Sequence, residues 1–216
     1  MHSTNNDLSL SASVCDSLTL ANHASMVGIE IVCASWSTAR RAPVGSSFPR
    51  RVRRRGCEIW GLRDLDARDR TLVLAGNRML RGAIRVIKRS LSLHQCGYLE
   101  NPRSSLMWHV LRRVFRRELA SGEMSLLPID MCRYGTAYKK PTTILVWGKD
   151  SHKIVLRTCN NSGICIRTGL PHEQLSSSSS CKYCVVNGAF RTSAAQAYPP
   201  RFVAHLLDQL WSLHRS

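Results

Sequence analysis

Two short apolar segments on either side of one long amphipathic helix constrain the fold of this chain most. Residues 28–32 have the pattern of a buried strand, and residues 97–99 form a second short apolar segment. Between them, Asp66 can cap a helix that runs to about Leu93 with its apolar residues on one stripe. This order favours a parallel βαβ unit. The sequence therefore predicts a Rossmann-like α/β fold with a mostly parallel sheet flanked by helices.

The second half of the chain continues the alternation of strands and helices. Residues 105–119 place apolar side chains on one arc and arginines on the other, as in an amphipathic helix. A last helix is expected from Pro199 or Pro200 to Trp211, because proline suits the first turn of a helix. Further strands are expected at 126–131, 142–147 and 153–158.

The chain is long enough for one hydrophobic core, and we expect one principal domain over residues 28–216. Residues 1–27 are rich in Ser, Asn and Thr, and we expect a poorly ordered N-terminal segment there. Apolar runs stay well short of a membrane span, and the first residues lack the pattern of a secretory signal. We therefore expect an intracellular protein without membrane association, in the nucleus or the cytoplasm.

The charge balance points to a polyanionic partner. The chain has 31 basic and 14 acidic residues, a formal net charge of +17, which favours nucleic acid through counterion release. The basic loop 40–56 contains seven arginines and no acid before Gly56, and it is either a solvated arm or a loop that contacts phosphates. The candidate nucleic-acid-binding residues are Arg40, Arg41, Arg51, Arg53, Arg54, Arg55, Lys139 and Lys140.

The cysteines leave two interpretations open. Their number, nine, is odd, which favours reduced thiols over a disulfide framework. In the first interpretation these thiols bind no metal. In the second interpretation, a Cys-x-x-Cys pair and nearby residues hold zinc, which prefers four such ligands. The residues available for that site are Cys159, Cys165, His172, Cys181 and Cys184.

Four short motifs occur in an order that resembles the second half of a cytosine-5 DNA methyltransferase. They are Cys33-Ala34-Ser35-Trp36-Ser37, Glu100-Asn101-Pro102, Tyr134-Gly135 with Lys139-Lys140, and Ala197-Tyr198-Pro199-Pro200. The Glu-Asn-Pro and Tyr-Pro segments are also similar to those of a group of predicted proteins from unicellular algae. The resemblance covers roughly residues 28–211 and is dense in about a quarter of them.

The resemblance implies a catalytic site at the ends of two neighbouring parallel strands. Cys33 stands at the position of the thiolate that adds to carbon 6 of cytosine, and Glu100 at the position of the acid that contacts ring nitrogen 3. Asn101 belongs to the same motif, and Lys140 falls at the first arginine position of the family's Arg-x-Arg segment. Residue chemistry alone favours a small buried apolar side chain for Cys33, and the motif context makes the two interpretations equal.

The sequence departs from the family at the methyl donor. The family binds S-adenosylmethionine with a Phe-x-Gly-x-Gly loop that residues 1–27 lack, and Ala195 and Gln196 replace a Gly-Asn pair near the donor. The resemblance thus implies a domain without its first cofactor-binding β-α unit, which a missing N-terminal part or a partner chain would supply. An active form would be an S-adenosylmethionine-dependent methyltransferase.

Two functions remain. The first is a divergent, inactive or partial cytosine-5 DNA methyltransferase-like protein that binds nucleic acid, with DNA as the first expectation. The second is a non-enzymatic basic nucleic-acid-binding module whose cysteines are structural or hold zinc.

Overall fold

The computed structural model describes residues 11–38, 50–159, 163–173, 175, 185–186, 189–190 and 197–215. Its centre is a four-stranded sheet in the order β1-β2-β4-β3. These strands are β1 (Met26–Glu30), β2 (Cys96–Pro102), β3 (Met124–Asp130) and β4 (Pro141–Trp147). A two-stranded hairpin is formed by β5 (Val185–Val186) and β6 (Ala189–Phe190). The fold is therefore α/β, as the sequence predicts.

The central sheet is mixed, which corrects the expectation of a mostly parallel sheet. Strands β1 and β2 are parallel, whereas β2–β4 and β3–β4 are antiparallel. Because β3 and β2 both run opposite to β4, β3 points the same way as β1 and β2. The connection 131–140 between β3 and β4 explains the reversal, since a parallel crossover takes about a dozen residues or more and usually a helix.

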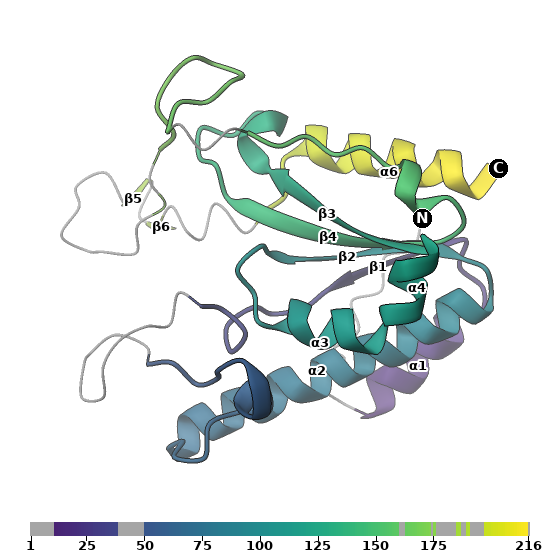
Figure 1. Ribbon diagram of the computed structural model, residues 1–216, viewed down its shortest axis with the longest axis vertical. Coiled ribbons are helices and arrows are strands. Elements are labelled where there is room, and N and C mark those ends of the chain that lie inside the picture. Colours follow the sequence, from purple (N-terminus) through teal and green to yellow (C-terminus); the bar gives the residue numbers. More distant parts are fainter. Residues whose placement is uncertain are drawn as a thin grey trace.

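Helices cover both faces of the sheet. Figure 1 shows α1 (Ser11–Ala21), α2 (Ala67–Ser92), α3 (Met107–Val114) and α4 (Arg116–Ser121) on one face and α6 (Pro200–Arg215) on the other. Alternate residues of β4 serve the two resulting cores. Leu145 and Trp147 pack with the α2 and α3 side, and Ile144 and Val146 pack with α6. The continuous apolar run of β4 follows from burial on both faces.

The long helix is confirmed, and its cap is the one predicted. The Asp69 backbone N–H donates to Asp66 Oδ1 at 2.7 Å, so the Asp66 side chain caps the first turn of α2. The expected helix 105–119 breaks at Phe115, whose buried ring lies in the core. Short 3-10 turns occur at η1 (Gly56–Trp60), η2 (Met131–Tyr134) and η3 (Ser151–Lys153). Among the described residues, no helix combines the length and apolar character needed to cross a membrane.

Two further expectations need correction. Residues 11–21, expected in a poorly ordered lead-in, form α1, while residues 1–10 lie outside the described part of the chain. Residues 154–158, expected to be part of a strand, are extended without strand pairing. The backbone N–H groups of Val155 and Arg157 donate instead to the Gln209 side chain at 3.2 Å and to the Tyr134 hydroxyl at 2.9 Å. Side-chain acceptors thus replace the ladder that a strand would need.

Candidate functional site

The parallel pair β1–β2 brings Cys33 and Glu100 to the same end of the sheet. Glu30, the last residue of β1, lies opposite Glu100, and Cys33 follows shortly after β1 ends. Burial raises the pKa of the Cys33 thiol above its ordinary value, the negative charge of Glu100 raises it further, and the charge of Lys140 lowers it. The structure thus assembles three of the sequence-predicted site residues in one electrostatic environment.

A tight turn holds the chain that follows Cys33. The backbone N–H groups of Trp36 and Ser37 both donate to the Cys33 carbonyl, at 2.9 and 2.8 Å. The buried Trp36 indole donates to the Gly76 carbonyl at 3.3 Å. A Cβ at Gly76 would lie 2.3 Å from Ser35 Oγ, so the turn can approach α2 this closely only at a glycine. The packing of helix α2 therefore sets the position of the turn.

The Arg53 side chain anchors the same turn. This position corrects the prediction that Arg53 contacts nucleic acid. Its side chain is buried, its Nε donates to the Ser35 carbonyl at 3.0 Å, and its guanidinium carbon lies 3.6 Å from the centroid of the Trp36 ring. Burial lowers the pKa of Arg53 to about 10. The remaining acceptors, all at 2.7–3.0 Å, are Ser35 Oγ, Asn77 Oδ1 and the carbonyls of Ile59 and Val73. This guanidinium is a structural group.

Glu100 is a buried acid with one oxygen held and one without a hydrogen-bond donor. Its residue is 8% exposed, Tyr198 donates to Oε2 at 2.8 Å, and Oε1 has no partner among the described residues. The Thr142 hydroxyl donates to the Lys140 carbonyl at 3.2 Å, and it also lies near enough to the carboxyl to lower the pKa of Glu100. Burial raises the pKa of Glu100, and the charge of Lys140 and the Tyr198 hydrogen bond offset this in part.

Asn101 holds the ends of the two parallel strands together. Its Nδ2 donates to the Ile31 carbonyl at 2.8 Å, two residues before Cys33. Its side chain is 1% exposed, and Oδ1 has no hydrogen-bond partner among the described residues. Two unsatisfied buried acceptors, Glu100 Oε1 and Asn101 Oδ1, therefore occupy consecutive residues of β2. Such atoms in a folded protein require an explanation, and a bound ligand is one.

Lys140 has an unusual backbone conformation beside the acid. Its φ of 36° lies in the left-handed region that lysine rarely adopts, and its Nζ lies 5.6 Å from the centroid of the Tyr198 ring. The neighbouring Lys139 carbonyl accepts from the Met131 backbone at 2.8 Å, which ties this loop to η2. Tyr198 was not among the predicted site residues. The Tyr-Pro-Pro motif was the sequence feature that could have identified Tyr198 as a site residue.

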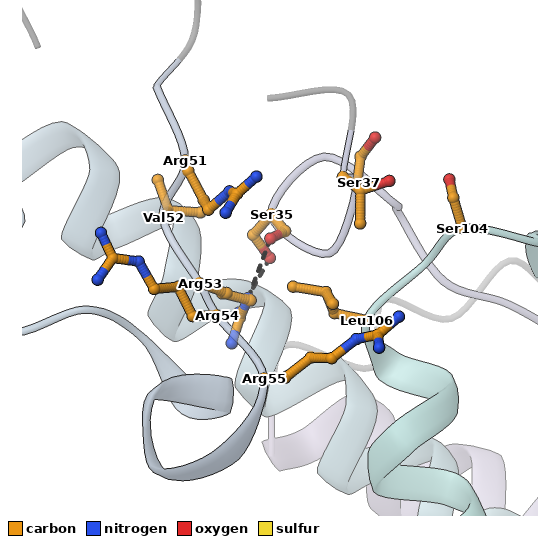
Figure 2. A pocket seen from close by; sticks show the side chains of 10 residues that line it. Ser35, Ser37, Arg51, Val52, Arg53, Arg54, Arg55, Ser104 and Leu106 are labelled. Carbon is orange, nitrogen blue, oxygen red and sulfur yellow. Dashed lines mark hydrogen bonds between the residues drawn. The ribbon is translucent and has the colours of Figure 1, made fainter. Parts of the chain in front are cut away.

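The exposed arginines of the basic loop line a pocket of about 510 Å³ next to the Cys33 turn. Figure 2 shows Ser37 and Ser104 on the opposite side of this pocket from Arg51 and Arg54. Arg55 also lines it, and Arg54 makes a 3.7 Å ion pair with Glu58 while its side chain remains 63% exposed. Arg40 and Arg41, also predicted to bind nucleic acid, lie outside the described residues.

A second cluster gathers three cysteines and a histidine near η2. Ligand atoms of Cys132, Cys159, Cys165 and His172 all lie within 4.8 Å of one another. Three of these four residues belong to the zinc set considered from the sequence. Cys132 was missed because it lies far from the others along the chain. Cys181 and Cys184, the rest of that set, lie outside the described residues.

The donor-side residues Ala195 and Gln196 also lie outside the described residues. Comparisons of the chain with protein-family models, with curated proteins and with solved structures each found no match. The function must therefore be argued from the geometry of the two clusters.

Proposed function

We propose that this chain is a divergent cytosine-5 DNA methyltransferase-like protein that binds nucleic acid and holds a cytosine ring between Cys33 and Glu100. One observation carries the proposal. A buried carboxyl with a raised pKa, one oxygen of which has no hydrogen-bond partner among the described residues, lies on β2 opposite the last residue of β1, the strand that leads to Cys33. The resemblance implies this pairing of a thiol and an acid on neighbouring parallel strands. It also implies that this fold lacks the first β-α unit of the family.

Glu100 suits the recognition of cytosine. Ring nitrogen 3 of neutral cytosine is a hydrogen-bond acceptor, so it needs a donor. A carboxyl whose pKa is raised by burial carries a proton more readily than an exposed one, and that proton can be donated from Oε1. Asn101 acts as a positioning residue, because its hydrogen bond to Ile31 holds the strand that leads to Cys33.

Cys33 is a thiol rather than a thiolate in this environment. Its pKa is raised by burial and by Glu100, whereas addition to carbon 6 requires the thiolate. Binding of the base is therefore better supported than turnover. S-adenosylmethionine would supply the methyl group. In residues 11–38 the one glycine is Gly28, within β1, and no glycine-rich turn follows that strand, so the proposal includes no step through the donor.

The pocket beside the Cys33 turn supplies the phosphate contacts. Arg51, Arg54 and Arg55 contribute cations, and Ser37 and Ser104 contribute hydroxyl groups on the opposite side. Phosphate contacts of this kind position a nucleic acid without reading its sequence. We expect affinity to fall steeply with salt. Substitution of Arg54 by alanine should reduce the slope of log K against log salt by about 1. A flat salt profile would remove the electrostatic argument.

The test of base recognition compares two single-stranded DNA oligonucleotides, one of thymines alone and one with a single central cytosine. By fluorescence anisotropy the full chain should prefer the cytosine oligonucleotide several-fold. Glu100→Ala should abolish this preference, whereas Glu100→Gln should retain most of it because its amide can donate to ring nitrogen 3. Glu123→Ala, which removes an exposed acid that does not shift the pKa of Glu100, is the matched control. Equal preference in Glu100→Ala and the wild type would refute the proposal. RNA versions of both oligonucleotides test the choice of DNA.

A covalent experiment separates binding from chemistry. An oligonucleotide that contains 5-fluorocytosine is incubated with the chain and S-adenosylmethionine, and covalent adducts are sought by mass spectrometry. Any adduct should disappear in Cys33→Ala and persist in Cys57→Ala, since Cys57 is exposed in η1. An adduct that survives Cys33→Ala would show that Cys33 is not the nucleophile.

The cluster of Cys132, Cys159, Cys165 and His172 favours a second candidate function, a basic nucleic-acid-binding module without base chemistry. Such a module would show the same salt dependence but no preference for cytosine. The anisotropy experiment thus decides between the two functions.

A further inference from the structure

We propose that Cys132, Cys159, Cys165 and His172 together bind one zinc ion. The four come from separate parts of the chain: Cys132 from η2, Cys159 from the end of the extended segment, and Cys165 and His172 from the segment 163–173. The proposal concerns a different set of residues from the base-binding site. It stands or fails independently of that function.

The distances suit tetrahedral zinc. Zinc–sulfur bonds of about 2.3 Å and zinc–nitrogen bonds of about 2.0–2.1 Å place neighbouring ligand atoms of a tetrahedron about 3.5–3.8 Å apart. Cys159 Sγ and His172 Nε2 lie 3.5 Å apart, and all four ligand atoms lie within 4.8 Å of one another. Small side-chain rotations are enough to close the site around an ion. Three sulfurs and one imidazole nitrogen in a tetrahedron select zinc among the common metals.

Groups around the ligands are already arranged as in a metal site. His172 Nδ1 lies 3.0 Å from the Gly163 carbonyl, so it carries the proton and leaves Nε2 free to bind an ion. The Ile166 backbone N–H donates to Cys159 Sγ at 3.5 Å, and the backbone N–H groups of Thr168 and Gly169 donate to the Cys165 carbonyl at 3.2 and 2.8 Å, which fixes the loop that carries Cys165. The hydrogen bond to Cys159 Sγ is of the kind that stabilises a thiolate ligand and orients it.

Hydrophobic packing does not account for these cysteines. Cys132, Cys159 and Cys165 form a buried cluster of their own, apart from the two apolar cores that sandwich the sheet. Within the described residues this cluster contains no aliphatic or aromatic member. Structural zinc supplies the stability that such a small region cannot obtain from apolar burial.

The site would fasten the segment 163–173 to the loop that carries Lys140. Arg167 donates to the carbonyls of Cys132 and Thr136, at 2.6 and 3.1 Å, and the Glu173 backbone donates to the Ala137 carbonyl at 3.0 Å. With four protein ligands the ion has no open position for substrate. Its role is therefore structural: it fixes the connection between β3 and β4.

The decisive measurement is the metal content of the full chain purified under reducing conditions from zinc-supplemented medium. One zinc per chain is expected by inductively coupled plasma mass spectrometry. Replacement by cobalt should give the intense visible bands of tetrahedral thiolate coordination. Metal-free protein without a cobalt spectrum would overturn the proposal, and so would a disulfide among Cys132, Cys159 and Cys165.

Variants identify the ligands. Cys132→Ser and His172→Ala should lose the metal, whereas His172→Cys should retain it with a changed cobalt spectrum, because a fourth thiolate replaces the imidazole. Cys57→Ser is the matched control, since Cys57 is exposed and belongs to η1. The double variant Cys181→Ser/Cys184→Ser should also keep one zinc. Loss of zinc in the double variant, or its retention in Cys132→Ser, would refute this ligand set.

A wild-type experiment covers the case in which a ligand variant fails to fold. Iodoacetamide alkylation followed by peptide mapping should spare Cys132, Cys159 and Cys165 until a chelator is added, whereas exposed Cys57 reacts throughout. Protection of the three cysteines that is unaffected by the chelator would contradict metal ligation.

Discussion

The Tyr198 hydroxyl donates a 2.8 Å hydrogen bond to Glu100 Oε2, joining two residues 98 positions apart. The bond connects the segment just before α6 to β2 and leaves Glu100 Oε1 without a hydrogen-bond partner within the described part of the chain. Because the carboxyl is buried, its protonation state depends on the few groups around it. Lys140, Tyr198 and Glu30 are the principal charged or polar neighbours.

Glu100 should make stability depend on pH in a predictable direction. Burial raises its pKa in the folded state, so the fold favours the protonated form, and this contribution is lost as pH rises through the folded-state pKa. The glutamine of Glu100→Gln does not ionise, so this variant does not lose stability in this way as pH rises. Its free energy of unfolding relative to the wild type should therefore increase from acid to neutral pH, by about 1.4 kcal/mol for each unit between the folded and unfolded pKa. Thermal melts over a pH series check this. A difference that shrinks with rising pH would contradict it, and Glu123→Gln, at an exposed acid that does not act on Glu100, is the control.

The reactivity of Cys33 should respond to its two charged neighbours in opposite directions. Removing the carboxylate in Glu100→Gln should lower the pKa of Cys33, and removing the cation in Lys140→Met should raise it. Alkylation rates of the Cys33 peptide against pH, measured by mass spectrometry, give the midpoint in each variant. Exposed Cys57 serves as the internal reference in the same samples. Identical midpoints in all three proteins would show that these charges do not act on the thiol.

Two neighbouring arginines should have separable effects. Arg53→Met removes the hydrogen bonds that Arg53 donates to the Ser35, Ile59 and Val73 carbonyls. We expect a loss of unfolding free energy of about 3 kcal/mol or more. Arg54→Met should change stability by less than about 0.5 kcal/mol, because the side chain is exposed and its ion pair is weak. It should instead weaken nucleic-acid binding. Urea unfolding and anisotropy on both variants check the contrast. Equal stability losses would contradict the structural role of Arg53.

Gly76→Ala should destabilise the protein although alanine is the better helix former. In an exposed helix this change stabilises by about 1 kcal/mol. Here the added Cβ would meet Ser35 Oγ at 2.3 Å, so the turn after Cys33 must move away from α2. Thr71→Ala, an exposed position of the same helix, should be neutral or slightly stabilising. Urea unfolding of both variants measures the difference, and a more stable Gly76→Ala would mean that the turn does not press on the helix.

Local signals were sufficient for much of the fold. Asp66 and the apolar stripe of α2 identified the long helix because capping and periodicity act within a few turns of chain. The predicted parallel pairing of the two strands that carry Glu100 and lead to Cys33 also agrees with the observed register, although β1 ends three residues before Cys33 and β2 continues past Glu100. The long helix and the two parallel strands together form a βαβ unit. The order of strand, helix and strand along the chain is enough to indicate such a unit.

Features that depend on distant contacts could not be read in the same way. Arg53 and Arg54 are adjacent in one basic run, yet one is buried on Trp36 and the other exposed, and composition alone cannot separate them. Cys132 joins the other ligands only after η2 and the segment 163–173 pack together. The reversed direction of β4 depends on the length of its connection rather than on its apolar pattern.

The order β1-β2-β4-β3 also dictates when the molecule can mature on the ribosome. Strand β3 is translated before β4 but adjoins only β4 in this sheet, so it has no docking partner until the later strand has left the exit tunnel. Glu100 likewise waits for its hydrogen-bond partner Tyr198, which follows it by 98 positions. Chain growth thus leaves one edge of β2 unpaired until β4 follows, and Glu100 gains its hydrogen bond from Tyr198 only after both strands have been made.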